Sequence, residues 1–441
     1  MTDVLVVRPE RPANGGEAVG RVDGRVVFVR GAIPGELVRV RVTGDRHSGF
    51  LRADVVEILE PSPHRVESIC DAAGHGAGCC DLAFIEPAYA RELKGRIVVD
   101  ALSRIGRFSA DDITAAGVDA DTVVDPLGGE ATGWRVRTRL GVDAHGRAGM
   151  RAFHDARIVV GHECAAPVPG MLDGLDAGSF TPGADLAVVA DMDGHRHITE
   201  LAPPAVSRPR HGRDRRGRAQ SARRHRDAPR PERVVEGGET AAHRVGERVW
   251  DIPVTGFWQA HRAAPEVYAN TVVDLLTRAD PPGADRGLVA WDLYGGAGVF
   301  AAGVLDHRTG GSVRSVHVVE SDAGAVAAAE QTLGDDDRVH THRAEVSAAV
   351  ADLPTPDVVI LDPPRTGAGA SVVGAIADAD PAVIVHVGCD VGRFARDLAL
   401  FTEHGYQVRE IRAFDAFPAT HHVEAIACLV PVNRQAPPQG R

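Results

Sequence analysis

Three residues near the end of the chain have side chains that could act together in a covalent reaction. The apolar run 382–388 ends at Cys389, and Asp362 and Glu424 lie at the ends of two further apolar runs. Aliphatic runs of this kind are typical of buried strands in a parallel sheet, and ligands bind just outside the carboxyl ends of such strands. A thiolate beside a carboxylate suits conjugate addition to a pyrimidine, alkylation and removal of a proton. Taken singly, a buried cysteine is usually inert and a glutamate at a strand edge is usually solvated.

A glycine-rich turn follows another apolar run. Residues 292–298 read DLYGGAG, which lets the backbone approach a ligand closely where a helix begins. Glu320 closes the next apolar run and could accept hydrogen bonds from ribose hydroxyls. Because the turn lacks the full dinucleotide fingerprint, it favours S-adenosylmethionine over a nicotinamide cofactor.

The segment 362–365 reads DPPR and begins with Asp362. Its two prolines stop the chain from turning directly into a helix, so the loop is expected to be rigid. Asp362 would then project into the crevice, as in many S-adenosylmethionine enzymes that modify a planar nitrogenous base. A plain turn at the end of a strand is the alternative.

Strand and helix signals alternate from about residue 249 onward. The expected strands are 288–293, 316–320, 358–362, 383–389, 407–412 and 424–430, and helices are expected at 322–333 and 391–401. This order indicates an α/β fold with a mostly parallel, Rossmann-like sheet flanked by helices. We assign residues 235–441 to this domain.

Two smaller domains are expected before it. Residues 1–60 read as a small β-barrel, with alternating valines at 38–42 and a hairpin signal at Asp23-Gly24. One face of the barrel carries arginines that could meet phosphates or form a solvated surface: Arg21, Arg25, Arg30, Arg39, Arg41 and Arg52. Residues 61–206 form a central α+β domain with a helix at 87–105 and strand-like pieces at 134–142 and 186–190.

The segment 207–234 differs in composition from the rest of the chain. It holds eleven arginines and almost no aliphatic residue, so it cannot bury enough apolar surface to order itself. We expect a disordered insertion. It could grip RNA backbone through its charge or be a solvated insertion without a partner.

Composition limits the class of protein. The chain has 441 residues, 44% of them hydrophobic, and a net charge of −12, so local patches must supply any attraction for nucleic acid. No run is long enough for a membrane span, and the start lacks the pattern of a signal peptide. The six irregularly spaced cysteines do not resemble a disulfide framework. We expect a cytoplasmic monomer whose cysteines bind metal or take part in catalysis.

Taken together, the motifs resemble those of the RNA (uracil-5-)-methyltransferases, and residues 1–60 are similar to the TRAM domain that precedes the catalytic part of many members. The likeness rests on Phe257-Trp258-Gln259, the segments 292–298 and 362–365, Glu320, Gly388-Cys389-Asp390 and the segment 415–424. The resemblance implies that S-adenosylmethionine is bound by Gln259, Tyr294, Glu320 and Asp362. It also implies that Cys389 is the nucleophile and that Glu424 takes the proton from carbon 5 of uridine.

The chain departs from the family pattern beside both motifs. The usual Ser-Cys-Asn-Pro reads Gly-Cys-Asp-Val at 388–391, and Phe-x-Gln-x-Asn reads Phe-Trp-Gln-Ala-His at 257–261. The nucleophile and the glutamine are kept while their flanks change. An altered substrate preference is therefore expected rather than loss of activity.

Four further cysteines resemble the iron–sulfur ligands of the rRNA-modifying members. They are Cys70, Cys79, Cys80 and Cys164. The usual Cys-Gly-Gly-Cys reads Ala-Gly-Cys-Cys at 77–80, so Cys79 could serve only if adjacent residues reach one metal centre. A 4Fe-4S cluster is the interpretation, with zinc or no metal as alternatives. Cys428, within an apolar run, is most simply part of the core.

The sequence thus predicts methylation of carbon 5 of a uridine in RNA through a covalent cysteine adduct, with rRNA favoured over tRNA. Two alternatives remain from the sequence. One is a noncatalytic protein that binds or folds RNA through the barrel and the basic insertion. The other is a methyltransferase that acts on a small molecule and leaves both basic regions unused.

Overall fold

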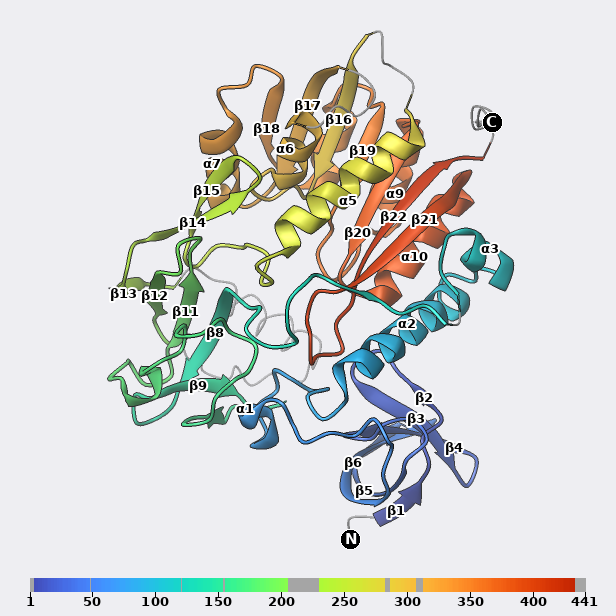
Figure 1. Ribbon diagram of the computed structural model, residues 1–441. Helices are drawn as coiled ribbons and strands as arrows, with labels where there is room; N and C mark the ends of the chain where they lie inside the picture. Colours follow the sequence, from blue (N-terminus) through green and yellow to red (C-terminus); the bar gives the residue numbers. More distant parts are fainter. Residues whose placement is uncertain are drawn as a thin grey trace, which may run out of the picture.

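A computed structural model describes residues 4–47, 49–119, 121–153, 155–204, 230–281, 286–306 and 312–432. Figure 1 shows three regions, with the largest sheet at the top and the N-terminal sheet at the lower right. A central sheet lies beside the junction of the two. Within the described ranges, no helix combines the length and apolarity that crossing a bilayer requires.

The N-terminal region is a six-stranded sheet around its own apolar cluster. Its strands are β1 (Val4–Val7), β2 (Arg11–Pro12), β3 (Glu17–Val22), β4 (Arg25–Arg30), β5 (Leu37–His47) and β6 (Phe50–Glu60). They are ordered β1-β5-β6-β4-β3-β2, and the expected hairpin at Asp23-Gly24 joins β3 to β4. Val38 and Val40 point into the cluster because alternate residues of a strand share a face.

The central region contains α1 (Asp71–Gly74), α2 (Pro87–Arg104), α3 (Ala110–Ala115), β7 (Asp125–Pro126), β8 (Arg137–Val142), β9 (Ala148–Arg151), β10 (Ile158–Val159), the 3-10 turn η1 (Leu175–Ala177), β11 (Asp185–Ala190) and β12 (Arg196–Leu201). The next elements are β13 (Glu232–Glu236) and the hairpin β14 (Thr240–Val245) and β15 (Arg248–Pro253). The central sheet has the order β10-β9-β8-β11-β12-β13.

Most of the arginine-rich segment expected to be disordered at 207–234 lies outside the described residues. Its last three residues differ from that expectation, because they belong to β13, which pairs antiparallel with β12. The local signal was misleading: pairing with β12 supplies the backbone hydrogen bonds that this polar strand cannot supply for itself. The central sheet therefore draws strands from both sides of the segment.

The largest sheet has eight strands in the order β18-β17-β16-β19-β20-β22-β21-β7. The elements are α5 (Ala264–Ala279), β16 (Leu288–Leu293), α6 (Val299–Asp306), β17 (Val313–Glu320), α7 (Ala323–Leu333), β18 (Val339–Arg343), α8 (Val346–Ala349), η2 (Val350–Asp352), β19 (Val358–Leu361), α9 (Gly369–Asp378), β20 (Val383–Gly388), α10 (Val391–Glu403), β21 (Tyr406–Asp415) and β22 (Glu424–Pro431). Strands β16 to β20 pair in parallel, while β22 is antiparallel to both of its neighbours.

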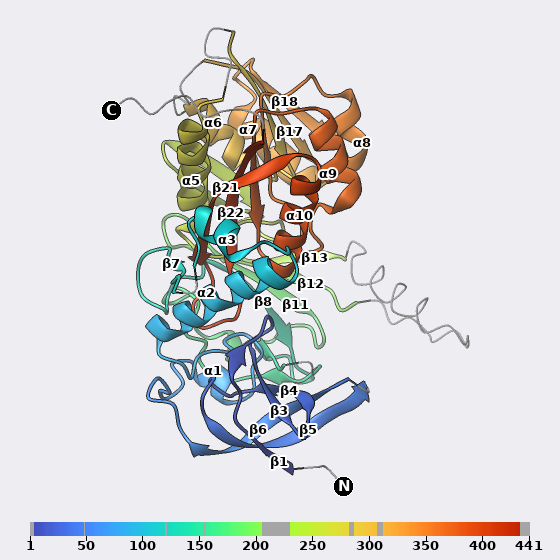
Figure 2. The same ribbon diagram turned by 90° about the vertical axis from the view of Figure 1, so that its right-hand side faces the viewer.

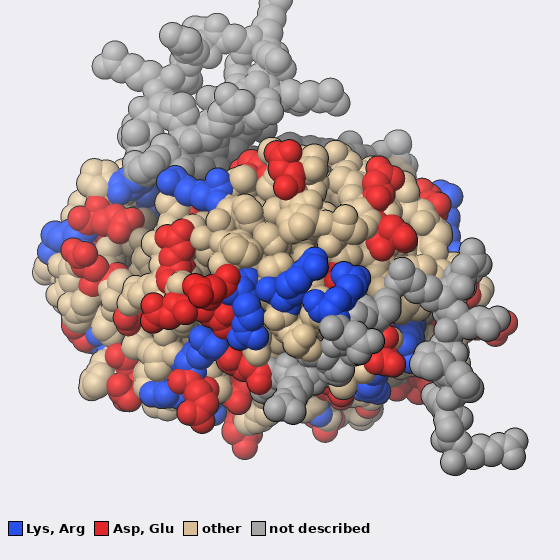
Figure 3. Space-filling model, turned by 90° about the horizontal axis from the view of Figure 1, so that it is seen from above, with Lys and Arg blue, Asp and Glu red and all other residues tan. Residues whose placement is uncertain are grey.

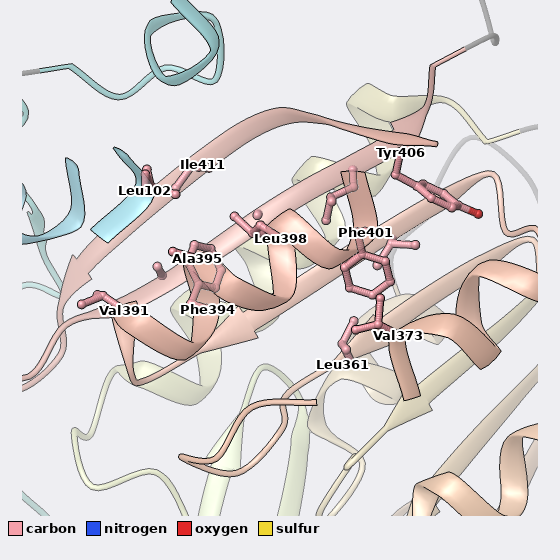
Figure 4. Packing of buried hydrophobic residues seen from close by; sticks show 14 of the residues in the cluster. Leu102, Leu361, Val373, Val391, Phe394, Ala395, Leu398, Phe401, Tyr406 and Ile411 are labelled. Carbon is pink, nitrogen blue, oxygen red and sulfur yellow. The ribbon is translucent and has the colours of Figure 1, made fainter. Parts of the chain in front are cut away.

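Helices cover both faces of this sheet. One apolar cluster includes residues of α5, α6 and α7, and the other includes residues of α9 and α10. Figure 4 shows Phe394, Leu398 and Phe401 of α10 packed on the sheet. Leu102 of α2 joins this second cluster, and Figure 2 shows α2 running beside α10. A helix of the central region thus completes the core of the large sheet.

Charge is mixed at the end of the molecule formed by the domain of the large sheet. Figure 3 views the molecule from the end opposite the N-terminal sheet and shows acidic and basic side chains side by side.

On the N-terminal sheet, Arg39 and Arg52 form ion pairs with Glu57 and Glu17. These two arginines of the face expected to meet phosphates therefore already have acidic partners.

Candidate active site

The pairing of three neighbouring strands brings the expected chemical groups to one edge of the sheet. In the antiparallel pair β20–β22, Gly388 lies opposite Ala425, so the next positions outward are Cys389 and Glu424. In the parallel pair β19–β20, Leu361 lies opposite His386, which places Asp362 at the same edge. Cys389 directly follows the last residue of β20, as expected. Residues separated by as much as 62 positions in the chain thus converge.

The glycine turn after β16 is compact. Tyr294 has a left-handed backbone (φ 59°), as do Gly296 and Gly298. A Cβ atom on Gly295 would lie 2.8 Å from Val318 and 2.9 Å from the side chain of Asp292, so only glycine fits there. Asp292 holds the turn on the following helix, because its carboxylate accepts a hydrogen bond from the Ala301 amide at 3.0 Å.

Glu320 closes the neighbouring side of this turn. Its carboxylate accepts hydrogen bonds from the backbone amides of Gly296, Ser321 and Asp322 at 3.2, 2.6 and 2.7 Å. These bonds fix the orientation of the carboxylate at the carboxyl end of β17. The acid and the glycine turn therefore form one wall.

A cavity of about 970 Å³ lies between this wall and the central sheet. All six residues that the sequence singled out for catalysis or cofactor binding line it: Gln259, Tyr294, Glu320, Asp362, Cys389 and Glu424. Its volume is large enough for a nucleoside-sized molecule together with a second ligand. The structure therefore brings the whole expected set together.

Burial governs the protonation of the acids in the cavity. Burial, together with the nearby carboxyl groups of Glu424 and Asp362, raises the pKa of Cys389 to about 12. Burial also raises the pKa of Asp362 to about 7 and holds the pKa of Glu424 well above its usual value. Three neighbouring acids thus favour their neutral forms in the unliganded protein, and a cationic ligand beside them would favour their ionised forms.

Sequence reasoning missed several residues of the cavity. Its far wall comes from the central sheet and includes Arg135, Arg137, Arg139 and Arg151, and the catalytic domain adds Tyr268, Arg365 and His422. Arg137 ties the two domains together, because its guanidinium donates to the carbonyl oxygens of Val254 and Pro253 at 2.6 and 3.1 Å. Arg365 was named only as part of a loop motif. The arginines of the far wall carried no local signal that marks a site.

The four cysteines of the central region also converge. The Sγ atoms of Cys70, Cys79, Cys80 and Cys164 all lie within 4.8 Å of one another, and those of Cys79 and Cys164 are 3.6 Å apart. All four thiols are free. Cys79 also lines the cavity, so the group of four thiols lies next to the site that contains Cys389. The thiols of the adjacent residues Cys79 and Cys80 both belong to this group of four. This is the arrangement that a single metal centre would require.

The fold and the cavity together define a class I methyltransferase domain, and known proteins agree with this class. A model of the TRAM domain matches residues 2–56. An RNA methyltransferase of Corynebacterium glutamicum is 40% identical over 437 residues, which cover 98% of each chain. One of Streptomyces avermitilis is 34% identical over 431 residues, covering 96% of this chain and 97% of the relative.

The chain therefore belongs to the RNA methyltransferase family, and the family and fold class expected from the sequence are confirmed. A 23S rRNA (uracil(1939)-C(5))-methyltransferase of Alkalilimnicola ehrlichii is 28% identical over 445 residues, covering 93% of each chain. Among solved structures, a Pyrococcus abyssi tRNA (uracil-54, C5)-methyltransferase in complex with S-adenosyl-L-homocysteine superposes with a TM-score of 0.64. That match has 20% identity and covers 96% of this chain and 99% of the other, so it supports the shared fold.

Proposed function

We propose that this methyltransferase transfers a methyl group from S-adenosylmethionine to carbon 5 of a uridine in RNA. The observation that carries the proposal is the register of β20 and β22, which sets Cys389 opposite Glu424 in one buried cavity. A nucleophile and a base at opposite positions of two paired strands can act on the two neighbouring ring carbons of a single pyrimidine. The named activity of the Alkalilimnicola ehrlichii relative agrees with this chemistry.

The reaction begins when the target uridine leaves its stack and enters the cavity, since a stacked base hides carbon 6. Cys389 loses its proton to solvent, its sulfur bonds to carbon 6, and the electron pair of the ring double bond makes carbon 5 nucleophilic. Carbon 5 then attacks the methyl group of the sulfonium donor, the bond between sulfur and methyl breaks, and the donor leaves as a neutral thioether. The carboxylate of Glu424 removes the remaining proton from carbon 5, the ring double bond re-forms, and the thiolate is released.

S-adenosylmethionine supplies an electrophilic methyl group on a cationic sulfonium. We assign its binding to Gln259, Tyr294, Glu320 and Asp362, which line the cavity around the glycine turn. The fixed carboxylate of Glu320 suits the ribose hydroxyls. Burial raises the pKa of Asp362 and of Glu424, and a positively charged ligand beside these carboxyl groups would stabilise their ionised forms.

RNA would approach from the side of the central and N-terminal domains. Arg139 and Arg151 line the cavity on that side, where they could contact backbone phosphates. The region matched by the TRAM model lies at the same end of the molecule as the central sheet, opposite the large sheet (Figure 1). We favour rRNA over tRNA because the Alkalilimnicola ehrlichii relative is named as a 23S rRNA methyltransferase and matches 93% of each chain.

The cysteine cluster fits a metal centre. Four free thiols that converge from two distant segments are the donor set of thiolate-bound zinc or iron. By family resemblance we propose a 4Fe-4S cluster held by Cys70, Cys79, Cys80 and Cys164. Zinc is the second candidate, because one tetrahedral ion with Zn–S bonds of about 2.3 Å holds its sulfurs roughly 3.8 Å apart, close to the present spacing.

The function is tested by nucleoside mass spectrometry of rRNA and tRNA from cells with and without the gene. Loss of 5-methyluridine from one RNA pool identifies the substrate, and unchanged 5-methyluridine in both pools contradicts the proposal. Complementation with Cys389→Ala should restore no methylation, while Cys428→Ala, which alters a buried cysteine of β22, should restore it. Methylation by the Cys389→Ala enzyme would rule out the covalent route.

A further inference from the structure

Tyr268 carries a buried hydroxyl group for which the structure provides no hydrogen-bond partner among the described residues. The residue lies in the first turns of α5 and has 1% of its surface exposed. Leaving a buried hydroxyl unpaired costs about 1–3 kcal/mol, so buried hydroxyls in folded proteins nearly always have a hydrogen-bond partner, and one without a protein partner calls for another. The hydroxyl of Tyr268 therefore points to a ligand.

The surroundings of Tyr268 identify where that ligand lies. The tyrosine lines the cavity together with Cys389, Asp362 and Glu424. Its ring packs against Phe414, with centroids 5.9 Å apart, and Phe414 is the direct cross-strand partner of Glu424. Tyr268 thus lies beside the thiol and the carboxylate between which the target base is proposed to sit.

The phenol is suited to donate a hydrogen bond rather than to ionise. Burial, with the carboxyl groups of Glu424 and Asp362 nearby, holds its pKa well above the usual value. The phenol therefore keeps its proton throughout the reaction. Its natural partner is an oxygen acceptor on which negative charge develops.

We propose that the hydroxyl of Tyr268 donates a hydrogen bond to a ring carbonyl oxygen of the target uracil and stabilises the enolate that forms on thiolate addition. This inference rests on the proposed function. When the sulfur of Cys389 bonds to carbon 6, the electron pair of the ring double bond is delocalised onto the oxygen at carbon 4. A donor already aimed at that oxygen stabilises the charge without reorganisation. The interaction also selects for a carbonyl at this position.

The chain offers a matched control for this tyrosine. Tyr406 is also buried, but its hydroxyl donates to the carbonyl oxygen of Pro381 at 3.0 Å, away from the cavity lining. The substitutions Tyr268→Phe and Tyr406→Phe remove the same atom from comparable degrees of burial. Only the second breaks a hydrogen bond of the unliganded protein.

The test compares these variants with the wild-type enzyme on RNA that carries 5-fluorouridine at the target position. Fluorine at carbon 5 cannot be removed as a proton, so the covalent adduct accumulates and its rate of formation reports addition and methylation alone. Tyr268→Phe should slow adduct formation by about 10²-fold, the typical effect of removing one oxyanion donor. The melting temperature of the unliganded variant should be unchanged or higher. Tyr406→Phe should lower the melting temperature and leave adduct formation unchanged.

Several results would overturn the inference. Adduct formation at the wild-type rate by Tyr268→Phe, with or without slower product release, would show that the hydroxyl does not act on the addition step. A drop in melting temperature as large as that of Tyr406→Phe would show that the hydroxyl has a structural partner. If the wild-type enzyme forms no adduct, the proposed uracil chemistry fails and the inference falls with it, which separates the two failures.

Discussion

Lys94 of α2 and Asp415 at the end of β21 form a buried ion pair between residues 321 positions apart in the chain. The ammonium group also donates to the carbonyl oxygen of Phe417 at 3.1 Å. It therefore holds the start of the loop that leads to Glu424, and that loop places Phe417, Thr420 and His422 on the cavity. A helix from the central region thus fixes a wall of the active site.

Replacing Lys94 with methionine should destabilise the protein and impair catalysis together. The substitution keeps much of the side-chain volume but leaves the buried carboxylate of Asp415 unpaired, which costs about 3–5 kcal/mol when one partner of a buried ion pair is removed. Chemical denaturation should show a lower free energy of unfolding. The folded fraction should also transfer methyl groups more slowly, because the loop to Glu424 loses its anchor.

Arg96 on the same helix provides the control. It forms an exposed pair with Glu92 at 3.9 Å, and such surface pairs contribute about 0–1 kcal/mol. Arg96→Met should therefore leave stability and activity close to those of the wild type. Equal effects of the two substitutions would mean that the buried pair does not anchor the loop.

The strands of the large sheet could be predicted from sequence because they are buried on both faces. Their aliphatic runs mark β16, β19 and β20 within one residue of the observed bounds, and the chemical groups follow directly at the strand ends. The spacing of the motifs along the chain then determined which groups converge. This is why all six expected site residues line one cavity.

The rest of the site depends on contacts between distant segments, which leave no local pattern. Arg137 faces the cavity only because β8 packs beside the loop after β15. Tyr268 resembles any apolar helix residue until the packing of α5 on the sheet shows its hydroxyl to be unpaired. Likewise, β7 has two residues and joins the sheet by pairing with β21, so periodicity could not reveal it.

Any side chain at position 298 should distort the glycine turn after β16. The backbone of Gly298 has φ 79°, and a Cβ atom would lie 2.8 Å from Leu333 of α7. Gly298→Ala should lower both the melting temperature and the affinity for S-adenosylmethionine, measured by isothermal titration calorimetry, because the turn must shift. Gly303 in α6 is the matched control: a Cβ there makes ordinary contacts at 3.4 Å, and alanine favours a helix interior by roughly 0.5–1 kcal/mol. Weakened binding in Gly303→Ala would contradict a local effect of the turn.

The unliganded Glu424→Gln variant should become more stable than the wild type, and its advantage in the free energy of unfolding should increase as the pH rises. The pKa of this buried carboxyl is raised in the folded state, so the folded protein keeps a proton that the unfolded chain loses above its ordinary pKa near 4.5. The contribution of this carboxyl to the free energy of unfolding of the wild type is therefore fully present below that pH. It decreases as the pH rises towards the pKa that Glu424 has in the folded protein. Glutamine carries no such penalty, so its advantage should be absent at pH 4 and grow towards pH 8.

Denaturant unfolding across this pH range measures the difference. The exposed Glu403 at the end of α10 supplies the control, since Glu403→Gln removes a carboxyl that is not buried. That variant should follow the wild-type pH profile. A constant difference between Glu424→Gln and the wild type at all pH values would show that the stability effect does not come from ionisation of Glu424.

If the four thiols hold the proposed metal centre, substitution of Cys70 by serine should lower the metal content and weaken the central region. Cys70 is fully buried at the N-cap of α1, and its thiol is one of the four that converge, so its loss leaves three thiolates for the proposed metal centre. Elemental analysis of anaerobically purified protein should find four irons with inorganic sulfide for a cluster, or one zinc for a single ion, and less of either in Cys70→Ser. Cys428→Ser alters a buried cysteine of β22 outside the cluster and should keep the full metal content. Equal metal content in the two variants, or none in the wild type, would show that these thiols do not form a metal site.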